Sequence, residues 1–142
     1  MENEQIIKTV IVEDHRAMRE GLTSLINFTP GYRCTGSYGT MEEALARLRH
    51  EKPDVVLSDI GLPGMDGIEG IRRMKEMYPD LIVLMLSVYD DDERIFDALC
   101  AGACGYLLKS TPPSKLLESL REAVGGGAPM SRISWLRVGL HR

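Results

Sequence analysis

Strand-length apolar runs alternate with helix-period stretches along this chain of 142 residues, and that alternation constrains its fold more than any other feature. Nearly continuous apolar runs predict strands buried on both faces, whereas apolar residues three and four apart predict helices with one apolar face. The predicted strands are Ile6 to Val12, Tyr32 to Tyr38, Val55 to Leu57, Leu81 to Leu86 and Gly105 to Leu108. The predicted helices contain Met18, Leu22, Leu25 and Ile26, then Ala44, Leu45 and Leu48, then Ile68, Ile71, Met74 and Met77, then residues 91–100 and 113–124.

Residues at the helix boundaries agree with this division. Thr40 and Glu43 have the spacing of a capping box, Pro112 and Pro113 suit a first helical turn, and Gly102 suits a left-handed helix end. Helical crossovers between successive strands require parallel pairing. The sequence therefore predicts a doubly wound α/β fold with a five-stranded parallel sheet and five helices, whose functional residues follow the carboxyl ends of the strands.

Composition narrows the function classes. The length suits one domain, and a formal net charge of −4 argues against direct binding to nucleic acid. We expect no membrane association and a cytoplasmic location, because no apolar stretch approaches the ~20 residues of a membrane helix. Cys34, Cys100 and Cys104 lie inside apolar stretches, which is typical of reduced core thiols rather than a zinc site or a disulfide framework.

Five polar residues follow the predicted strands. Taken singly, an acidic residue after a strand is usually a solvated loop or capping residue. Together they would meet at one edge of the sheet, where three converging carboxylates repel one another unless a hard divalent cation lies among them. Mg²⁺ is the expected ion. These residues are Glu13, Asp14, Asp59, Ser87 and Lys109.

The segment from Asp59 to Gly67, with the sequence DIGLPGMDG, is the most specific motif, and GYLLK ends at Lys109. With the acidic pair Glu13 and Asp14, these motifs resemble the receiver domains of two-component response regulators. The resemblance spans residue 8 to about residue 124. It implies a flavodoxin-like strand order 2-1-3-4-5 and a domain that accepts a phosphoryl group.

The resemblance also implies roles for the acidic residues. Asp59 would be the nucleophile that takes a phosphoryl group from a sensor histidine kinase or a small phosphodonor. Mg²⁺ would be held by Asp14, Asp59, the backbone carbonyl of Gly61 and, through water, Glu13. Such a domain catalyses its own phosphorylation and slow dephosphorylation and turns over no external substrate.

Three further residues would respond to the phosphoryl group. Lys109 would pair with one phosphoryl oxygen and Ser87 would donate its hydroxyl to another. Tyr106 would then follow Ser87 inward, although a half-buried tyrosine with its hydroxyl in water describes its resting state equally well. The fourth helix, fifth strand and fifth helix, residues 91–124, would form the output or homodimer surface.

Some positions depart from the family pattern. Val88 is larger than the usual Ala or Gly and is expected to crowd the approach to the phosphoryl group. Gly61 and Tyr89 occupy positions that tune dephosphorylation, and we predict slow self-hydrolysis. Ser110 replaces a common proline, which leaves open the isomer of the peptide bond after Lys109.

The amino-acid sequences of residues 86–93 and 126–130 resemble those of the LuxR/NarL subgroup, in which the receiver precedes a helix-turn-helix domain. We expect a receiver domain at 1–124 and a linker or tail at 125–142, with the DNA-binding output domain for transcription regulation absent from this chain. Truncation is the favoured explanation over a single-domain regulator.

Other interpretations compete with phosphoacceptance. A flavodoxin would need an anion-binding loop where Glu13 and Asp14 stand, and an aspartyl phosphatase would need Asp where Gly61 stands. The serious alternative is a degenerate receiver that serves as a phosphorylation-independent interaction module. His15 is interpreted as a loop or first-turn residue, and the acidic run 90–93 as helix capping.

Overall fold

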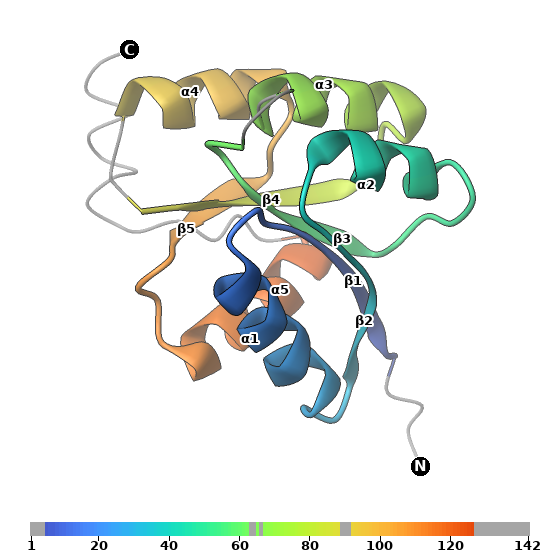
Figure 1. The fold of residues 1–142 in the computed structure, drawn as a ribbon, viewed down its shortest axis with the longest axis vertical. Helices are drawn as coiled ribbons and strands as arrows, with labels where there is room; N and C mark the ends of the chain where they lie inside the picture. The colour runs from blue at the N-terminus through green and yellow to red at the C-terminus, as the bar shows by residue number, and fades with distance from the viewer. Residues whose placement is uncertain (1–4, 63–64, 66, 89–91, 127–142) are drawn as a thin grey trace.

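The computed structural model describes residues 5–62, 65, 67–88 and 92–126 and divides them into alternating strands and helices (Figure 1). All five predicted strands and five predicted helices are present, with boundaries within a few residues of the predicted ones. The strands are β1 (Ile7–Val12), β2 (Tyr32–Tyr38), β3 (Val55–Asp59), β4 (Ile82–Ser87) and β5 (Gly105–Leu108). The helices are α1 (Arg16–Asn27), α2 (Met41–Leu48), α3 (Gly67–Met77), α4 (Asp92–Ala101) and α5 (Pro113–Val124).

The strands form one parallel sheet in the order β2-β1-β3-β4-β5, which confirms the doubly wound α/β prediction. β3 lies at the centre, between β1 and β4. Its register pairs Asp59 with Leu86, and Ser87 pairs with Leu108 on β5. The last residues of β3 and β4 and the residue after β5 therefore lie next to one another at one edge of the sheet.

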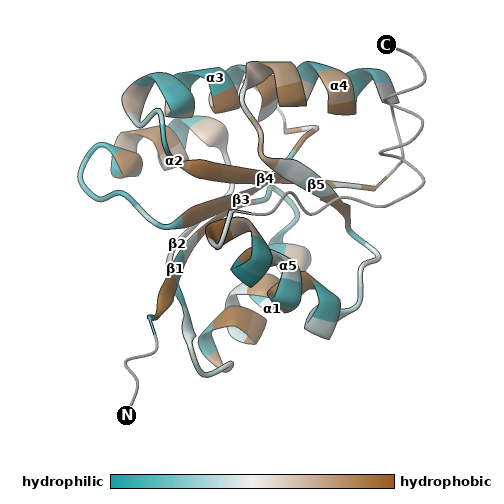
Figure 2. Cartoon of the chain, turned by 180° about the vertical axis from the view of Figure 1, so that it is seen from behind, coloured by the Kyte–Doolittle hydropathy of each residue, from teal (hydrophilic) through white to brown (hydrophobic). Residues whose placement is uncertain are grey.

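Helices cover both faces of the sheet in two layers (Figures 1 and 2). α2, α3 and α4 pack on one face over a core that includes Met41, Ile71 and Ile95, and α1 and α5 pack on the other over Leu22 and Leu116. Figure 2 shows the strands as largely hydrophobic while the helices are mixed, as expected for strands buried on both sides. None of the described helices is long and apolar enough to cross a bilayer.

The helix ends follow the predicted signals with one change. The Thr40 hydroxyl accepts the Glu43 N–H at 3.2 Å, but the Glu43 carboxylate reaches the N–H of Gly39 at 3.4 Å, one residue before the cap. Pro113 is the first residue of α5, and Gly102 after α4 has a φ of 121°. The acidic run lies partly outside the described residues, which include Glu93 but neither Asp90 nor Asp91.

The prediction of three core thiols is wrong for one of them. Cys34 and Cys104 are partly buried, but Cys100 is exposed on α4. All three are free thiols. Helical periodicity placed residue 100 within the pattern, yet it lies on the side of α4 that faces away from the sheet core.

Candidate functional site

The carboxyl end of the sheet gathers the five polar residues predicted from the strand ends. β1 runs into Glu13 and Asp14, β3 ends at Asp59, β4 ends at Ser87, and Lys109 follows β5. Because β3 lies between β1 and β4, the acidic residues come from adjacent strands. The predicted convergence is therefore present in the fold.

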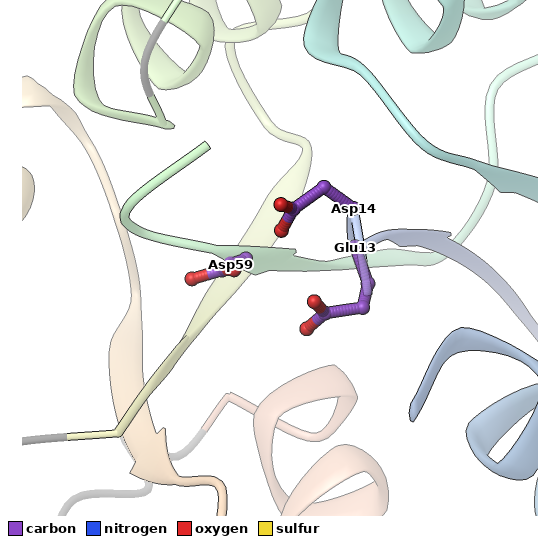
Figure 3. A group of neighbouring side chains, drawn as sticks. All are labelled: Glu13, Asp14 and Asp59. Carbon is purple, nitrogen blue, oxygen red and sulfur yellow. The ribbon is translucent and has the colours of Figure 1, made fainter. Parts of the chain in front are cut away.

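Three carboxylates meet at this edge (Figure 3). Glu13, Asp14 and Asp59 each offer one oxygen, and these oxygens all lie within 4.8 Å of one another. Glu13 is fully buried, Asp59 is 8% exposed and Asp14 faces solvent. Carboxylate oxygens are the hard donors that Mg²⁺ prefers, and the exposed Asp14 leaves the group open to water, from which such an ion keeps several ligands. The donor set fits a magnesium ion.

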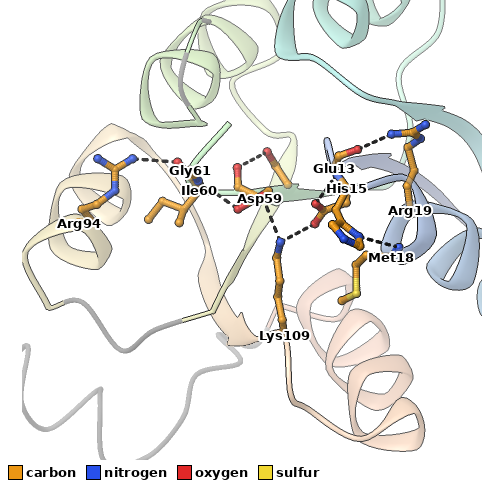
Figure 4. A network of polar contacts seen from close by, with 10 residues as sticks. Glu13, His15, Met18, Arg19, Asp59, Ile60, Gly61, Arg94 and Lys109 are labelled. Carbon is orange, nitrogen blue, oxygen red and sulfur yellow. Dashed lines mark hydrogen bonds and ion pairs between the residues drawn. The ribbon is translucent and has the colours of Figure 1, made fainter. Parts of the chain in front are cut away.

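Lys109 already contacts two of these carboxylates. Its ammonium lies 2.8 Å from Oε1 of Glu13 and 3.1 Å from Oδ2 of Asp59 (Figure 4). Burial alone lowers the pKa of Lys109, but the hydrogen bonds and negative charge of Glu13 and Asp59 outweigh it, and the net pKa is raised. The lysine is therefore held as a cation beside the predicted nucleophile.

Glu13 is fixed by its own loop as well. Its Oε2 accepts the backbone N–H of His15 at 2.9 Å, and its backbone carbonyl accepts a hydrogen bond from Nη1 of Arg19 at 2.8 Å. His15 is the N-cap of α1, where its Nδ1 accepts the N–H of Met18 at 3.4 Å. This agrees with the first-turn interpretation of His15, whose imidazole caps a helix.

Hydrogen bonds hold the first residues after β3. The N–H of Gly61 donates to Oδ1 of Asp59 at 3.0 Å, and Nη2 of Arg94 donates to the carbonyl of Ile60 at 2.8 Å (Figure 4). A Cβ on Gly67 would lie 2.6 Å from the carbonyl oxygen of Asp59, so the start of α3 requires glycine there. Neither Arg19 nor Arg94 was predicted from the sequence, because a single basic residue on a helix belongs to no motif.

The burial of Ser87, Tyr106 and Val88 bears on their predicted roles around the phosphoryl group. Ser87 is buried, and Tyr106 is fully buried, so the half-buried description of Tyr106 is wrong. The side chain packs into the core beneath α2, α3 and α4 because it lies on the face of β5 that these helices cover. Val88 is 62% exposed, and its effect on access stays a prediction. Tyr89 lies outside the described residues.

The peptide bond between Lys109 and Ser110, whose isomer the sequence left open, is trans, because the described residues contain no cis peptide. The backbone N–H of Lys109 donates to the carbonyl of Ser87 at 2.8 Å. The residue after β5 thus continues the pairing of β5 with β4. This pairing directs the Lys109 side chain from the end of the sheet toward Asp59.

Fold and site together define a CheY-like receiver, a domain with five parallel strands and an acidic group at their carboxyl ends. Residues 9–121 match the family model of the response regulator receiver domain. The chain therefore belongs to the response regulator receiver family. Among solved structures, it resembles a LuxR-family two-component response regulator from Aurantimonas sp. SI85-9A1, with a TM-score of 0.89, 29% identity and coverage of 97% of this chain and 99% of that one.

The signal receiver domain of the putative response regulator NarL from Mycobacterium tuberculosis is also similar, with a TM-score of 0.79, 27% identity and coverage of 86% of this chain and 98% of that one. The transcriptional regulatory protein DegU of Brevibacillus brevis is 36% identical over 89% of this chain and 53% of its own length. The transcriptional activator DevR/DosR of M. tuberculosis is 37% identical over 86% of this chain and 56% of its own length. The chain thus spans about half the length of these curated relatives, and its receiver is of the NarL/LuxR kind.

Proposed function

We propose that Asp59 accepts a phosphoryl group from the phosphohistidine of a sensor histidine kinase and that the chain thereby controls an output, in the cytoplasm. An O–P bond forms at Asp59 as the N–P bond of the donor breaks, and the histidine nitrogen leaves with the electron pair and takes a proton from water. The observation that carries the proposal is the convergence of Glu13, Asp14 and Asp59, with Lys109 at 3.1 Å from the Asp59 carboxylate.

Asp14, Asp59 and the carbonyl of Gly61 would hold Mg²⁺, with Glu13 acting through water. The bound ion supplies positive charge to the oxygens of the transferred group. The indirect role of Glu13 is supported by its existing contacts, because one of its carboxylate oxygens faces Lys109 and the other accepts a backbone N–H. Asp14 is exposed and is free to turn toward the ion.

Lys109 and Ser87 would carry the signal away from Asp59. Lys109 would leave its contact with Oδ2 for a phosphoryl oxygen, and the hydroxyl of Ser87 would donate to another. Such contacts exist in one state only, which is the condition for phosphorylation to shift a conformational equilibrium. Tyr106, already buried, would keep its inward position in the phosphorylated state, and α4, β5 and α5 would form the surface for an output domain or a homodimer.

In this proposal the chain catalyses its own phosphorylation and slow dephosphorylation and turns over no external substrate. In this proposal residues 125–142 form a linker or tail, and DNA binding belongs to a separate C-terminal domain. In the same proposal, Val88, Tyr89 and Gly61 set the access and lifetime of the acyl phosphate.

Intact-mass spectrometry after incubation with acetyl phosphate and Mg²⁺ tests the proposal. The native chain should gain one phosphoryl group, ~80 Da, whereas Asp59→Asn should gain nothing and metal removal should abolish the adduct. Absence of the adduct with both acetyl phosphate and a phosphorylated kinase would overturn the proposal. The phosphorylation-independent interaction module would then be the better reading, and its partner binding should survive Asp59→Asn.

A further inference from the structure

The peptide group between Ile60 and Gly61 connects α4 to the carboxylate of Asp59. Its carbonyl oxygen accepts a hydrogen bond from Arg94 at 2.8 Å, and its N–H donates to Oδ1 of Asp59 at 3.0 Å. A trans peptide group is planar, so its C=O and N–H point in opposite directions and rotate together. Any rotation of this plane changes both hydrogen bonds at once.

Other contacts hold the Ile60 side of this peptide group. The N–H of Ile60 donates to the carbonyl of Leu86 at 3.0 Å, which fixes Ile60 to β4, and the Ile60 side chain is buried. On the α3 side, Gly67 approaches so closely that a Cβ there would lie 3.0 Å from the carbonyl oxygen of Ile60. The hydrogen bond from Arg94 is therefore a direct link through which α4 can influence the tilt of the peptide.

The charge of Arg94 adds to this geometry. A hydrogen bond from a guanidinium is stronger than one between neutral groups, and it polarises the peptide so that the N–H at its other end becomes a better donor. Gly61 then holds Oδ1 of Asp59 more firmly. Oδ2 of the same carboxylate faces Lys109, so the two oxygens have different partners.

From this chain of contacts we infer that Arg94 is a positioning residue, which orients the Asp59 carboxylate through the Ile60 to Gly61 peptide and transmits changes at Asp59 to α4. The inference rests on the proposed phosphoacceptor function. It assigns to one side chain the link between the phosphorylation site and the first turns of a helix on the output surface.

The chain offers a matched control. Arg19 on α1 also donates to a loop carbonyl at 2.8 Å, that of Glu13, and it is partly buried like Arg94. α1 lies on the opposite face of the sheet from α4 (Figure 1). Arg19→Met and Arg94→Met therefore each remove a guanidinium that donates to a loop carbonyl, and each keeps an apolar stem of similar length and a good helix former. They differ in which loop they release.

The first readout needs no ligand. In the full chain at rest, the Gly61 amide of Arg94→Met should exchange with solvent about tenfold faster than in the native protein, and its proton resonance should move upfield as its hydrogen bond weakens. Arg19→Met should leave both unchanged. A Gly61 amide with native exchange and native shift in Arg94→Met would overturn the inference.

The second readout is amide exchange over α4 after addition of Mg²⁺ and beryllofluoride, a phosphoryl mimic. At saturating Mg²⁺ and beryllofluoride, the native protein and Arg19→Met should reach the same change in α4, and Arg94→Met should lose most of it. An undiminished α4 response in Arg94→Met would overturn the inference. It would also be overturned if the α4 amides of Arg94→Met were unprotected from exchange before ligand is added. If the native protein itself fails to respond, the proposed function fails, whereas the resting Gly61 amide still tests the contact.

Discussion

The carboxylates at the two ends of the sheet differ in their burial and in their partners. At the amino end, Asp54 accepts the N–H of Lys8 at 2.8 Å and its own N–H donates to the Lys8 carbonyl at 2.9 Å, which ties the entry of β3 to β1. The carboxylate there stays partly in water. At the carboxyl end, Glu13 is fully buried, and its side chain and that of Asp59 face the ammonium of Lys109.

This difference in burial distinguishes a carboxylate that stabilises the fold from carboxylates that serve the proposed function. A half-exposed carboxylate on a backbone N–H is favourable for folding, whereas burying two carboxylates and one ammonium costs desolvation that their attraction only partly offsets. Apolar side chains of similar volume would fill the same space at less cost. The buried charges at the carboxyl end are thus explained by the chemistry proposed there.

Removal of Lys109 should have the largest effect on stability. Lys109→Met leaves Glu13 and Asp59 facing each other without a cation, and we expect the free energy of unfolding to fall by about 3 kcal/mol. Urea unfolding in the presence of a chelator measures it. Adding Glu13→Gln to Lys109→Met should restore more than half of the loss, and a single variant as stable as the native protein would show that the ion pairs contribute nothing.

Gly67→Ala should have the next largest effect, also at the carboxyl end. The added Cβ would lie 2.6 Å from the carbonyl oxygen of Asp59 and 3.0 Å from Cα of Ile60, both backbone atoms that cannot turn aside. We expect a loss of about 2 kcal/mol in thermal or urea unfolding. Gly61→Ala is the control, because a Cβ there meets nothing within 4 Å, and equal losses in the two variants would contradict the packing argument.

The sequence predicted the fold and the acidic cluster well, for the same reason. In a parallel sheet the carboxyl ends of the strands meet at one edge, so locating strand ends locates Glu13, Asp59 and Lys109 without knowledge of packing. The strand order agrees with the family resemblance. Metal coordination by Asp14 and Gly61 is still a prediction.

Packing and long-range side-chain contacts could not be predicted in this way. Whether Tyr106 is half or fully buried depends on which helices cover its face of β5, and the exposure of Cys100 depends on the rotation of α4. Arg19 and Arg94 bind backbone carbonyls, which exist at every residue and leave no pattern in the sequence. Such contacts become visible only when loops from distant segments are placed together.

Asp54→Ala should test the amino end of the sheet. The substitution removes one hydrogen bond to the N–H of Lys8, which solvent can partly replace, so we expect a loss of about 1 kcal/mol in urea unfolding. Asp54→Asn, which keeps an acceptor oxygen, should lose less. If Asp54→Ala lowered the free energy of unfolding as much as Lys109→Met does, the carboxylates at the two ends of the sheet would not differ in their contribution to stability.

The smallest expected effect is a change in the reactivity of the Cys34 thiol, which lies near the amino end of β2. Burial raises the pKa of Cys34 and outweighs the hydrogen bonds that lower it, whereas at Lys109 the partners outweigh burial. Less thiolate forms on Cys34 at pH 8, so iodoacetamide should modify it several-fold more slowly than the exposed Cys100, as followed by peptide mass spectrometry. Because the folded state holds the thiol proton more tightly, the contribution of this thiol to the free energy of unfolding is complete below the unfolded pKa and declines as pH rises through the folded pKa. Equal modification rates at Cys34 and Cys100 would show that burial does not suppress thiolate formation on Cys34.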